Sequence, residues 1–450
     1  MLPIKRYMQI QIISLAWPVV LEMVWIMVVN ILLTAMVGSF GAVALASVGL
    51  SGLVQFSTAM IFAAAGTGSS ALISREWGAK NNHEVRVIAG QALQIGGILG
   101  ILLSAVGFYI APAFFVFTGA EQNIAELAGQ LLRINFLSTP LFMIFAIGNA
   151  VLRGIGQTRT AFYISSFANT VVLIVSYILI FGLLSPALGA YGAAWGTCLG
   201  QAIGGIIVLV VLKFHKSICL DWTEIFIFRA DVIKRILAIS IPAALEQVSL
   251  QGGRIVFTLL LASVGSVQFA AHQIAMQVES ISFMPGFGFS VAAMTLVGQY
   301  LGKGMTHRAV QYVWLTCKMA FGGMAVMGLV FFIFAEELTS LFINDPEVVF
   351  WGAICVKIAA LEQITIAITY VFGGALRGAG DTKWPFYITT IGVWVVRMPL
   401  IYLFINVWHY DITAAWFITA GDFLVRSIIL WWRFATSRWE SKENACGTQP

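Results

Sequence analysis

The chain carries one sequence pattern twice. Pro18 and Glu22 return as Pro242 and Glu246, which sets an offset of 224 residues. The other matches at this offset are LRGIGQT at 152–158 with LRGAGDT at 376–382, and FYI at 162–164 with FYI at 386–388. A constant offset over most of each half indicates that one ancestral unit was duplicated. In a strongly apolar chain, internal repeats of this size are typical of secondary transporters, whose substrate site lies where the repeats meet.

The composition indicates that the lipid bilayer is the solvent of this chain. Of its 450 residues, 60% are hydrophobic and 10% charged, with a mean hydropathy of +0.91, whereas an average soluble domain is about 25% charged. A membrane-spanning helix needs about 20 apolar residues. The sequence predicts twelve spans, at roughly 10–37, 44–74, 89–112, 128–150, 162–184, 191–212, 240–262, 269–300, 311–335, 351–375, 385–407 and 413–434. The first apolar run is too long for a cleaved signal peptide.

The charged loops predict the orientation. With a cytoplasmic N-terminus, the basic loop residues all lie inside, and the opposite loops contain acids but no Lys or Arg. Both termini are then cytoplasmic, and the halves enter the membrane in the same sense, as parallel repeats. We therefore expect an all-α, multi-pass protein of the plasma (inner) membrane with two parallel-related six-helix bundles. The predicted parts are bundles at 1–212 and 236–435, a cytoplasmic linker at 213–235 and a cytoplasmic tail at 436–450.

The sequence lacks the motifs of soluble enzymes and of ATP hydrolysis. No HExxH, Walker A or strand-linked GxGxxG motif occurs, and the five histidines lie far apart. The five cysteines include no CxxC pair, so we expect neither a disulfide framework nor a zinc site. We therefore predict a protein that is not an enzyme and has no cofactor, driven most simply by an ion gradient. The net charge of +5 reflects membrane orientation and does not indicate nucleic-acid binding.

Three motifs resemble the multidrug and toxic compound extrusion (MATE) family. They are the segment 264–302, which includes VGSVQFAAHQI and ESISFMPGFGFS, the pentapeptide TAMVG at 34–38, and the Arg-Gly turns at 153–154 and 377–382. The resemblance covers about residues 10–435. It implies two six-helix bundles around a V-shaped cleft, and export of organic, often cationic, compounds in exchange for protons or sodium ions. The sequence departs from the family at one position, because many prokaryotic relatives carry an aspartate where this chain has Leu33.

Acidic residues inside the predicted spans are candidates for ion coupling, because a charge at bilayer depth is costly and usually faces a cavity or a partner. With Leu33 in place of the family's aspartate, we expect coupling on Glu246 and Glu279, supported by Glu22 and Glu362. A buried carboxylate can exchange a proton, or bind sodium or an organic cation. The alternative for Glu22 and Glu246 is a structural role, in which the carboxylate caps a proline-loosened helix or pairs with a neighbouring basic residue. Both ions stay open, and the proton is favoured because no cluster of oxygen ligands is visible in the sequence.

Two arginines are the expected charge partners of these acids. Arg254 and Glu279 lie at similar depth on consecutive antiparallel helices, which predicts a salt bridge between them. Arg397 is the expected counter-charge of Glu362.

Other spanning residues are assigned mainly structural roles. Asp422 and Arg426 are spaced i,i+4 and are expected to pair on one helix face. Pro18 and Pro242 precede the repeated glutamates and are the expected hinges. We expect His272 in a loop at the membrane interface.

The leading interpretation is an ion-coupled antiporter that exports amphipathic organic cations by alternating access. The main alternative is a lipid-linked saccharide flippase of the same broader superfamily, which would need a strongly cationic cavity. An intramembrane enzyme is disfavoured by the absence of a paired catalytic motif. The expected partners are small organic substrates and the bilayer, with no nucleic acid, and we expect a monomer.

Overall fold

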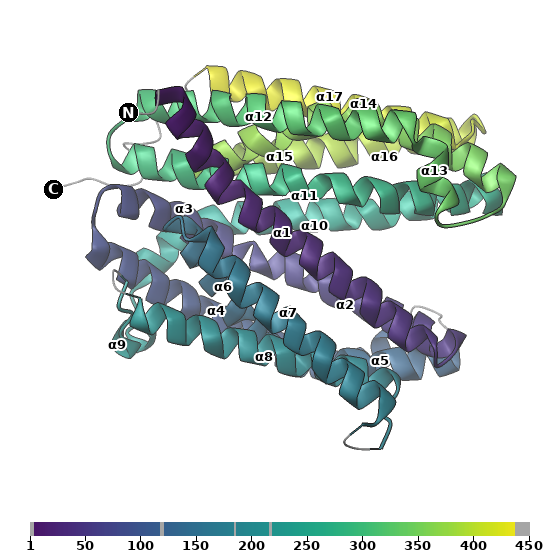
Figure 1. The fold of residues 1–450 in the computed structure, drawn as a ribbon, viewed down its shortest axis with the longest axis horizontal. Coiled ribbons are helices and arrows are strands. Elements are labelled where there is room, and N and C mark those ends of the chain that lie inside the picture. Colours follow the sequence, from purple (N-terminus) through teal and green to yellow (C-terminus); the bar gives the residue numbers. More distant parts are fainter. Residues whose placement is uncertain (1–3, 118–120, 184–185, 216–217, 437–450) are drawn as a thin grey trace. The chain divides into compact units, whose positions relative to one another are not determined.

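Long α-helices form nearly all of the chain that the structure describes, which comprises residues 4–117, 121–183, 186–215 and 218–436 of a computed structural model (Figure 1). Eleven helices in this part are long and apolar enough to cross a membrane. A twelfth span results if the pair bent by 56° at Ser138 is counted as one. The predicted all-α membrane fold is therefore confirmed. The predicted tail lies almost entirely outside the described residues.

The first repeat contains eight helices that form six predicted spans. Two spans are interrupted, one between α2 and α3 and the other between α5 and α6. The helices are α1 (Ile4–Gly38), α2 (Ala42–Ala63), α3 (Ala65–Gly78), α4 (Asn82–Phe117), α5 (Gln122–Leu137), α6 (Thr139–Gly154), α7 (Thr158–Phe181) and α8 (Ala190–Phe214).

The second repeat follows a short linker helix, α9 (Trp222–Phe226). The eleventh span of the chain, Lys383–Val407, is the counterpart of α7 in the first repeat. It differs from α7 because it contains two π-helical segments. The elements are α10 (Ala230–Leu261), η1 (Ala262–Val264), α11 (Ser266–Gly302), α12 (Thr306–Ile333), α13 (Ala335–Ser340), α14 (Pro346–Gly378), α15 (Lys383–Thr390), the π segment η2 (Ile391–Arg397), α16 (Met398–Ile401), the π segment η3 (Tyr402–Val407) and α17 (Ile412–Ala435).

The repeated Arg-Gly motif ends a long helix in the same way in both halves. Gly156 and Gly380 have φ angles of +88° and +84°, a region that residues with a Cβ rarely adopt. The preceding Gly154 and Gly378 allow close helix packing. A Cβ on Gly154 would lie 2.9 Å from a backbone oxygen of α3, and one on Gly378 would lie 2.3 Å from a backbone oxygen of α11. The motif therefore recurs because the turn and the packing recur.

The chain folds into two compact units whose boundaries lie inside helices. The first unit (unit 1) combines the residues up to Val20 with those from Leu245 onward, and the second (unit 2) comprises Leu21–Ala244. The chain therefore passes between the units only within α1 and within α10. Each passage lies two residues beyond a proline, Pro18 in α1 and Pro242 in α10.

Each unit receives a half-helix from the other repeat. The first half of α1 packs on Gly288 of α11, where a Cβ would lie 2.9 Å from the carbonyl oxygen of Ala16. The first half of α10 packs on Gly68 of α3, where a Cβ would lie 2.2 Å from Oγ of Ser240. Ala16 and Ser240 are equivalent at the repeat offset. The predicted bundles, 1–212 and 236–435, differ from the compact units by this exchange.

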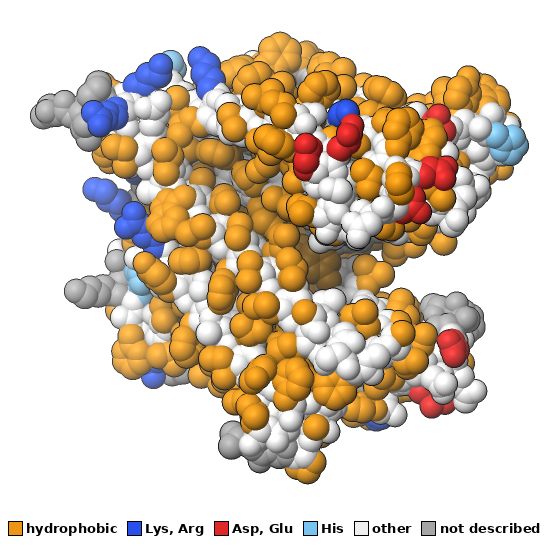
Figure 2. All heavy atoms as spheres, turned by 45° about the vertical axis from the view of Figure 1, so that its right-hand side comes forward, with side chains coloured by type: hydrophobic (Ala, Val, Ile, Leu, Met, Phe, Trp, Pro, Cys, Tyr) orange, Lys and Arg blue, Asp and Glu red, His pale blue; other side chains and the backbone are white. Residues whose placement is uncertain are grey.

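The charged side chains are unevenly distributed along each unit. On the face shown in Figure 2, most Lys and Arg side chains of each unit lie at the left-hand end, and most Asp and Glu side chains lie toward the right-hand end. Between them the surface is largely apolar, as expected of helices that face acyl chains.

The prediction that His272 lies in an interfacial loop is wrong. His272 lies in the second turn of α11 and is buried. Its ring packs at 5.0 Å from the ring of Phe257 and at 5.8 Å from that of Trp416, measured between centroids. Aromatic neighbours from two other helices, α10 and α17, cover this ring, so the side chain lies inside the protein.

Candidate functional site

All four acids predicted as site residues are buried. Glu22, Glu246, Glu279 and Glu362 are each at most 4% exposed. A buried carboxylate is stable only when it is paired, hydrogen-bonded or neutralised. The partners of these four acids therefore indicate what each one can do, and they divide the acids into two classes.

Glu22 belongs to the first class of acids, which are paired with an arginine, and both of its carboxylate oxygens have hydrogen-bond partners. Nη2 of Arg153, at the end of α6, lies 2.7 Å and 2.8 Å from the two carboxylate oxygens. Ser165 of α7 donates a third hydrogen bond of 2.7 Å, and Asn149 of α6 donates to the Ser165 hydroxyl at 3.1 Å. This arrangement fastens α1 to α6 and α7 just beyond Pro18.

Glu246 has the same arrangement in the second repeat. Nη2 of Arg377, at the end of α14, donates to Glu246 at 2.7 Å, and the hydroxyl of Thr389 in α15 donates at 3.2 Å. All three residues are offset by 224 positions from Glu22, Arg153 and Ser165. We call the two arrangements the repeat-related ion pairs.

A tryptophan hydrogen bond accompanies each repeat-related ion pair. Nε1 of Trp25 in α1 donates to the carbonyl oxygen of Ser166 in α7 at 3.2 Å. In the second repeat the donor is on the other helix, because Nε1 of Trp394 in η2 donates to the carbonyl oxygen of Ser249 in α10, also at 3.2 Å. Both halves thus fix the same two helices to each other, although the tryptophans themselves are not equivalent.

Asp422 of α17 is the centre of a second buried charge network. Its Oδ2 lies 2.6 Å from Nη2 of Arg397 and 2.6 Å from Nη2 of Arg426. The predicted i,i+4 pair between Asp422 and Arg426 is therefore confirmed. Both guanidiniums also lie over the ring of Phe423, with centroid distances of 5.2 Å and 4.4 Å. We call Asp422, Arg397 and Arg426 the charged triad.

The expected partners of Glu279 and Glu362 are placed differently. Arg397 pairs with Asp422 and forms no ion pair with Glu362. Among the described residues, Arg254 forms no salt bridge within 4 Å of Glu279. The spacing of Arg254 and Glu279 along the chain indicates similar depths, but it does not indicate which side of α10 or α11 each residue occupies.

Glu279 and Glu362 form the second class of acids because their carboxylates are incompletely paired. Within the described part of the chain, neither oxygen of Glu362 has a hydrogen-bond partner, and Oε1 of Glu279 has none. The two carboxylates act electrostatically on each other, and Arg397 acts on both. Glu279, Glu362 and the charged triad therefore form one buried cluster on α11, α14, η2 and α17, and Arg254 of α10 also acts electrostatically on Glu279.

This cluster is specific to the second repeat. The positions 224 residues earlier hold uncharged side chains in every case: Gln55, Ser138, Leu173, Cys198 and Ala202 correspond to Glu279, Glu362, Arg397, Asp422 and Arg426. In the first repeat, the Ser138 hydroxyl donates to Gln201 at 3.0 Å. The repeat-related ion pairs are therefore common to both halves, whereas the buried cluster of Glu279, Glu362 and the charged triad belongs to the second repeat.

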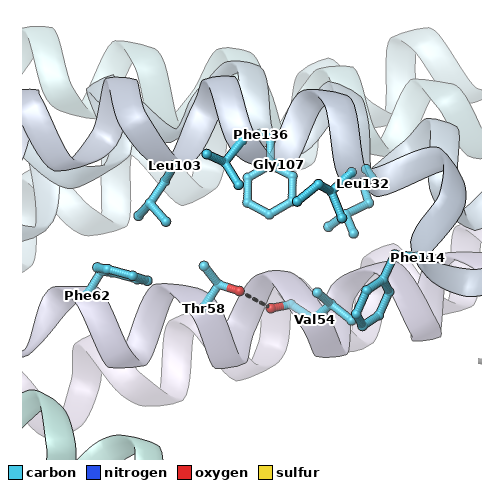
Figure 3. Close-up of a pocket in the computed structure, with 11 residues that line it drawn as sticks. Val54, Thr58, Phe62, Leu103, Gly107, Phe114, Leu132 and Phe136 are labelled. Carbon is cyan, nitrogen blue, oxygen red and sulfur yellow. Dashed lines mark hydrogen bonds between the residues drawn. The ribbon is translucent and has the colours of Figure 1, made fainter.

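An apolar cavity in unit 2 is separate from these charges. It has a volume of about 290 Å³ between α2, α4 and α5 and is lined by residues that include Phe62, Phe114 and Phe136 (Figure 3). The hydroxyl of Thr58, which also lines it, donates to the carbonyl oxygen of Val54 at 2.8 Å. The cavity therefore offers apolar contact without an acid or base, and none of the predicted site residues lines it.

A family model described as MatE matches the chain twice, over residues 18–178 and 242–403. The two matches begin at the two repeated prolines. The chain belongs to the MatE family. Its relatives include a probable multidrug resistance protein NorM of Thermotoga maritima, 30% identical over 441 residues and covering 96% of this chain and 93% of the relative. A probable NorM of Rhodopseudomonas palustris is 27% identical and covers 94% and 91% of the two chains.

Solved structures of MATE proteins have the same fold. A MOP-superfamily transporter of Pyrococcus furiosus aligns with a TM-score of 0.89 at 19% identity, over 98% of this chain and 96% of that one. An outward-facing multidrug resistance MATE transporter aligns with a TM-score of 0.87 at 19% identity, over 98% and 96%. By the family model and its multidrug resistance relatives, this MATE protein is a membrane transporter and not an enzyme.

Arg153 and Arg377 were not named as the partners of Glu22 and Glu246, and Arg397 was expected beside Glu362 but pairs with Asp422. Arg153 and Arg377 were visible as part of a repeated motif, and their shared offset with Glu22 and Glu246 was the signal that could have paired them. For the charged triad, the only signal in the sequence was the i,i+4 spacing of Asp422 and Arg426. Arg397 could not be paired with Asp422 in this way, because it lies on another helix.

Proposed function

We propose that this MATE protein exports amphipathic organic cations in exchange for a coupling cation, and that Glu279 and Glu362 carry the coupling. The observation that carries the proposal is the pair of buried carboxylates with unpartnered oxygens beside the charged triad. A buried carboxylate binds a cation most strongly when no other donor satisfies it. One proton, one sodium ion or one organic cation would complete the cluster.

The four acids have different roles in this proposal. Glu22 and Glu246 are engaged by arginine and by a hydroxyl at 3.2 Å or less, so a cation would have to displace a guanidinium to bind there. We assign these two acids to holding α1 and α10 in place. Glu279 and Glu362 need no such displacement, so we transfer the main coupling role from Glu246 to this pair.

Competition for one cluster links the two transported species. If the coupling cation and the organic cation both neutralise Glu279 and Glu362, binding of one promotes release of the other, as exchange requires. The proton remains the favoured coupling ion, because within the described cluster of Glu279, Glu362 and the charged triad only the two glutamates have unpartnered buried oxygens. Sodium would need a fuller set of oxygen ligands than these.

Alternating access is assigned to the two helices that belong to both units. Pro18 and Pro242 lie inside α1 and α10, where proline removes a backbone hydrogen bond and loosens one turn. The repeat-related ion pairs lie on the far side of each proline. We propose that Pro18 and Pro242 are the hinges and that the ion pairs keep the following half-helix fixed within its own unit.

The names of the curated relatives and the charge of the cluster support a drug exporter over a lipid flippase. A probable multidrug resistance protein matches over most of its length. A lipid-linked saccharide carries a pyrophosphate, and the unpartnered buried carboxylate oxygens of Glu279 and Glu362 would repel it. The positive end of each unit (Figure 2) supports cytoplasmic termini in the plasma membrane. We propose that the protein works as a monomer.

The test is dye transport in reconstituted vesicles with an imposed proton or sodium gradient. Glu279→Gln and Glu362→Gln should each reduce the rate of gradient-driven transport at least about tenfold, which corresponds to ~1.4 kcal/mol. Glu126→Gln changes an exposed acid outside the cluster and should leave transport unchanged. Full transport by the Glu279→Gln, Glu362→Gln double variant would overturn the assignment of coupling. Transport of no cationic dye by the unmodified protein would overturn the proposed substrate class.

A further inference from the structure

The linker between the repeats exposes three consecutive large apolar side chains, which begin at the last residue of α9. Phe226, Ile227 and Phe228 are 78%, 50% and 67% exposed. Burial of one such side chain is worth about 2 kcal/mol in water. A run of three exposed together is therefore unfavourable unless something other than water covers it.

Gln91 of α4 holds the backbone of this run in place. Its Nε2 donates to the carbonyl oxygens of Glu224 at 3.0 Å and Ile227 at 2.7 Å, and its Oε1 accepts from the backbone N–H of Arg229 at 2.9 Å. Gly90 allows the close approach, because a Cβ there would lie 2.5 Å from the carbonyl oxygen of Glu224. The linker is thus a preformed element, with its polar backbone turned inward and its apolar side chains turned outward.

The length of α4 places this element at the edge of the membrane core. The helix has 36 residues, about 54 Å, against a hydrocarbon core of about 30 Å. If the helix is centred, about 12 Å extends beyond the core at each end. Gln91 lies about 13 Å along the helix from Asn82, at this same boundary.

The lipid-facing surface of α8 continues toward the linker. Ile206, Val210 and Phe214 recur every fourth residue on one face, and all three are exposed. The linker folds back onto the end of this helix, because the N–H of Leu220 donates to the carbonyl oxygen of Leu212 at 3.2 Å. The linker that contains the exposed run therefore starts from the end of a helix whose exposed face is apolar.

The geometry points to a membrane-inserted linker: we propose that Phe226, Ile227 and Phe228 enter the bilayer at the boundary between headgroups and acyl chains. Charged side chains flank the run in the way that interfacial segments require. Arg229 pairs with Glu224 at 3.4 Å, and Lys213 lies with Nζ 5.8 Å from the ring centroid of Phe214, so the cations stay at headgroup level. The linker thereby anchors the end of unit 2 that contains α9 and the start of α10.

Spin-label accessibility in the full-length protein tests this proposal. In a background whose native cysteines are replaced, a nitroxide is attached to Phe226→Cys or Phe228→Cys, both exposed positions where a label should not disturb folding. The protein is reconstituted in phospholipid vesicles, and collision with oxygen is compared with collision with a water-soluble nickel chelate. We expect oxygen access to exceed nickel access at both positions. Asp221→Cys and Asp231→Cys, exposed and just outside the run, should show the reverse.

Two results would overturn the proposal. Nickel access at 226 and 228 equal to that at 221 would show that water covers the run. Protection from both oxygen and nickel would show that protein covers it, as in a contact between two copies of the chain. A further variant, Gln91→Leu, removes the clamp. It should increase label motion at 226 and reduce the oxygen preference, whereas an unchanged label would remove the role assigned to Gln91.

Discussion

Arg377 and Glu246 form a 2.7 Å ion pair that repeats, 224 residues later, the 2.7 Å pair of Arg153 with Glu22. Each pair joins the helix that passes between the units to the end of a helix within its own unit. Because the carboxylates are almost fully buried while the guanidiniums retain some exposure, each pair resembles a fixed structural contact more than a site for exchangeable ions.

Breaking one repeat-related ion pair should destabilise the protein. Glu246→Gln leaves the Arg377 guanidinium without its counter-charge and should cost about 2 to 4 kcal/mol, reduced from the fully buried case by the partial exposure of the arginine. Thermal unfolding in detergent measures the loss. Glu246→Gln combined with Arg377→Gln should cost less than the sum of the single changes, since the two residues interact directly. Additive losses would contradict the pairing.

The proline hinges should affect transport more than stability. Pro18→Ala and Pro242→Ala each restore a helical hydrogen bond and stiffen one turn, so we expect slower dye export with unchanged or higher thermal stability. The matched control is Pro112→Ala in α4, a proline within a helix that belongs to unit 2 alone. If Pro112→Ala slows export as much as the other two changes, a hinge role for Pro18 and Pro242 loses its support.

Removing the central acid of the charged triad should be more costly than breaking an ordinary pair. Asp422→Asn leaves two buried guanidiniums facing each other, and we expect a loss of about 3 to 5 kcal/mol. Cys198→Ala changes the equivalent buried position of the first repeat and should cost about 1 to 2 kcal/mol for the lost packing. Similar midpoints of thermal unfolding for the two variants would argue against a triad that is important for folding.

The close contact at Gly392 gives a steric test of the same triad. A Cβ at Gly392 would lie 2.5 Å from Oδ1 of Asp422 and 2.9 Å from Cδ of Arg426, so Gly392→Ala should displace the triad and lower both stability and transport. Gly421→Ala, on α17, introduces the same methyl group where no atom lies within 4 Å. That control should be neutral or slightly stabilising, as expected for alanine in a helix. Equal behaviour of the two variants would contradict the described packing.

The orientation can be checked with a membrane-impermeant thiol reagent on intact cells. In a cysteine-replaced background, Glu347→Cys, exposed at the start of α14, should react from outside. Arg308→Cys, exposed near the start of α12, should react only after the membrane is opened. The reverse pattern would place both termini outside.

The sequence predicted the helices more completely than the contacts between charges. Apolar length alone locates a span, and the glycines at 156 and 380 mark turns that any chain with this motif must form. Pairing depends on the rotation of each helix about its axis, which hydropathy does not encode when all faces are apolar. Arg397 shows this best, because the π-helical turns of η2 alter the direction of its side chain. Depth therefore suggested Glu362 as its partner, whereas packing assigns Asp422.

Exchange of the first halves of α1 and α10 makes the repeats interdependent. A cut in the linker would leave the N-terminal fragment with residues 4–20, whose packing surface is on α11, and the C-terminal fragment with residues 230–244, whose packing surface is on α3. Neither fragment would complete its own core. The arrangement is that of a domain-swapped dimer joined into one chain, so gene duplication and fusion could preserve the swap without any new contact.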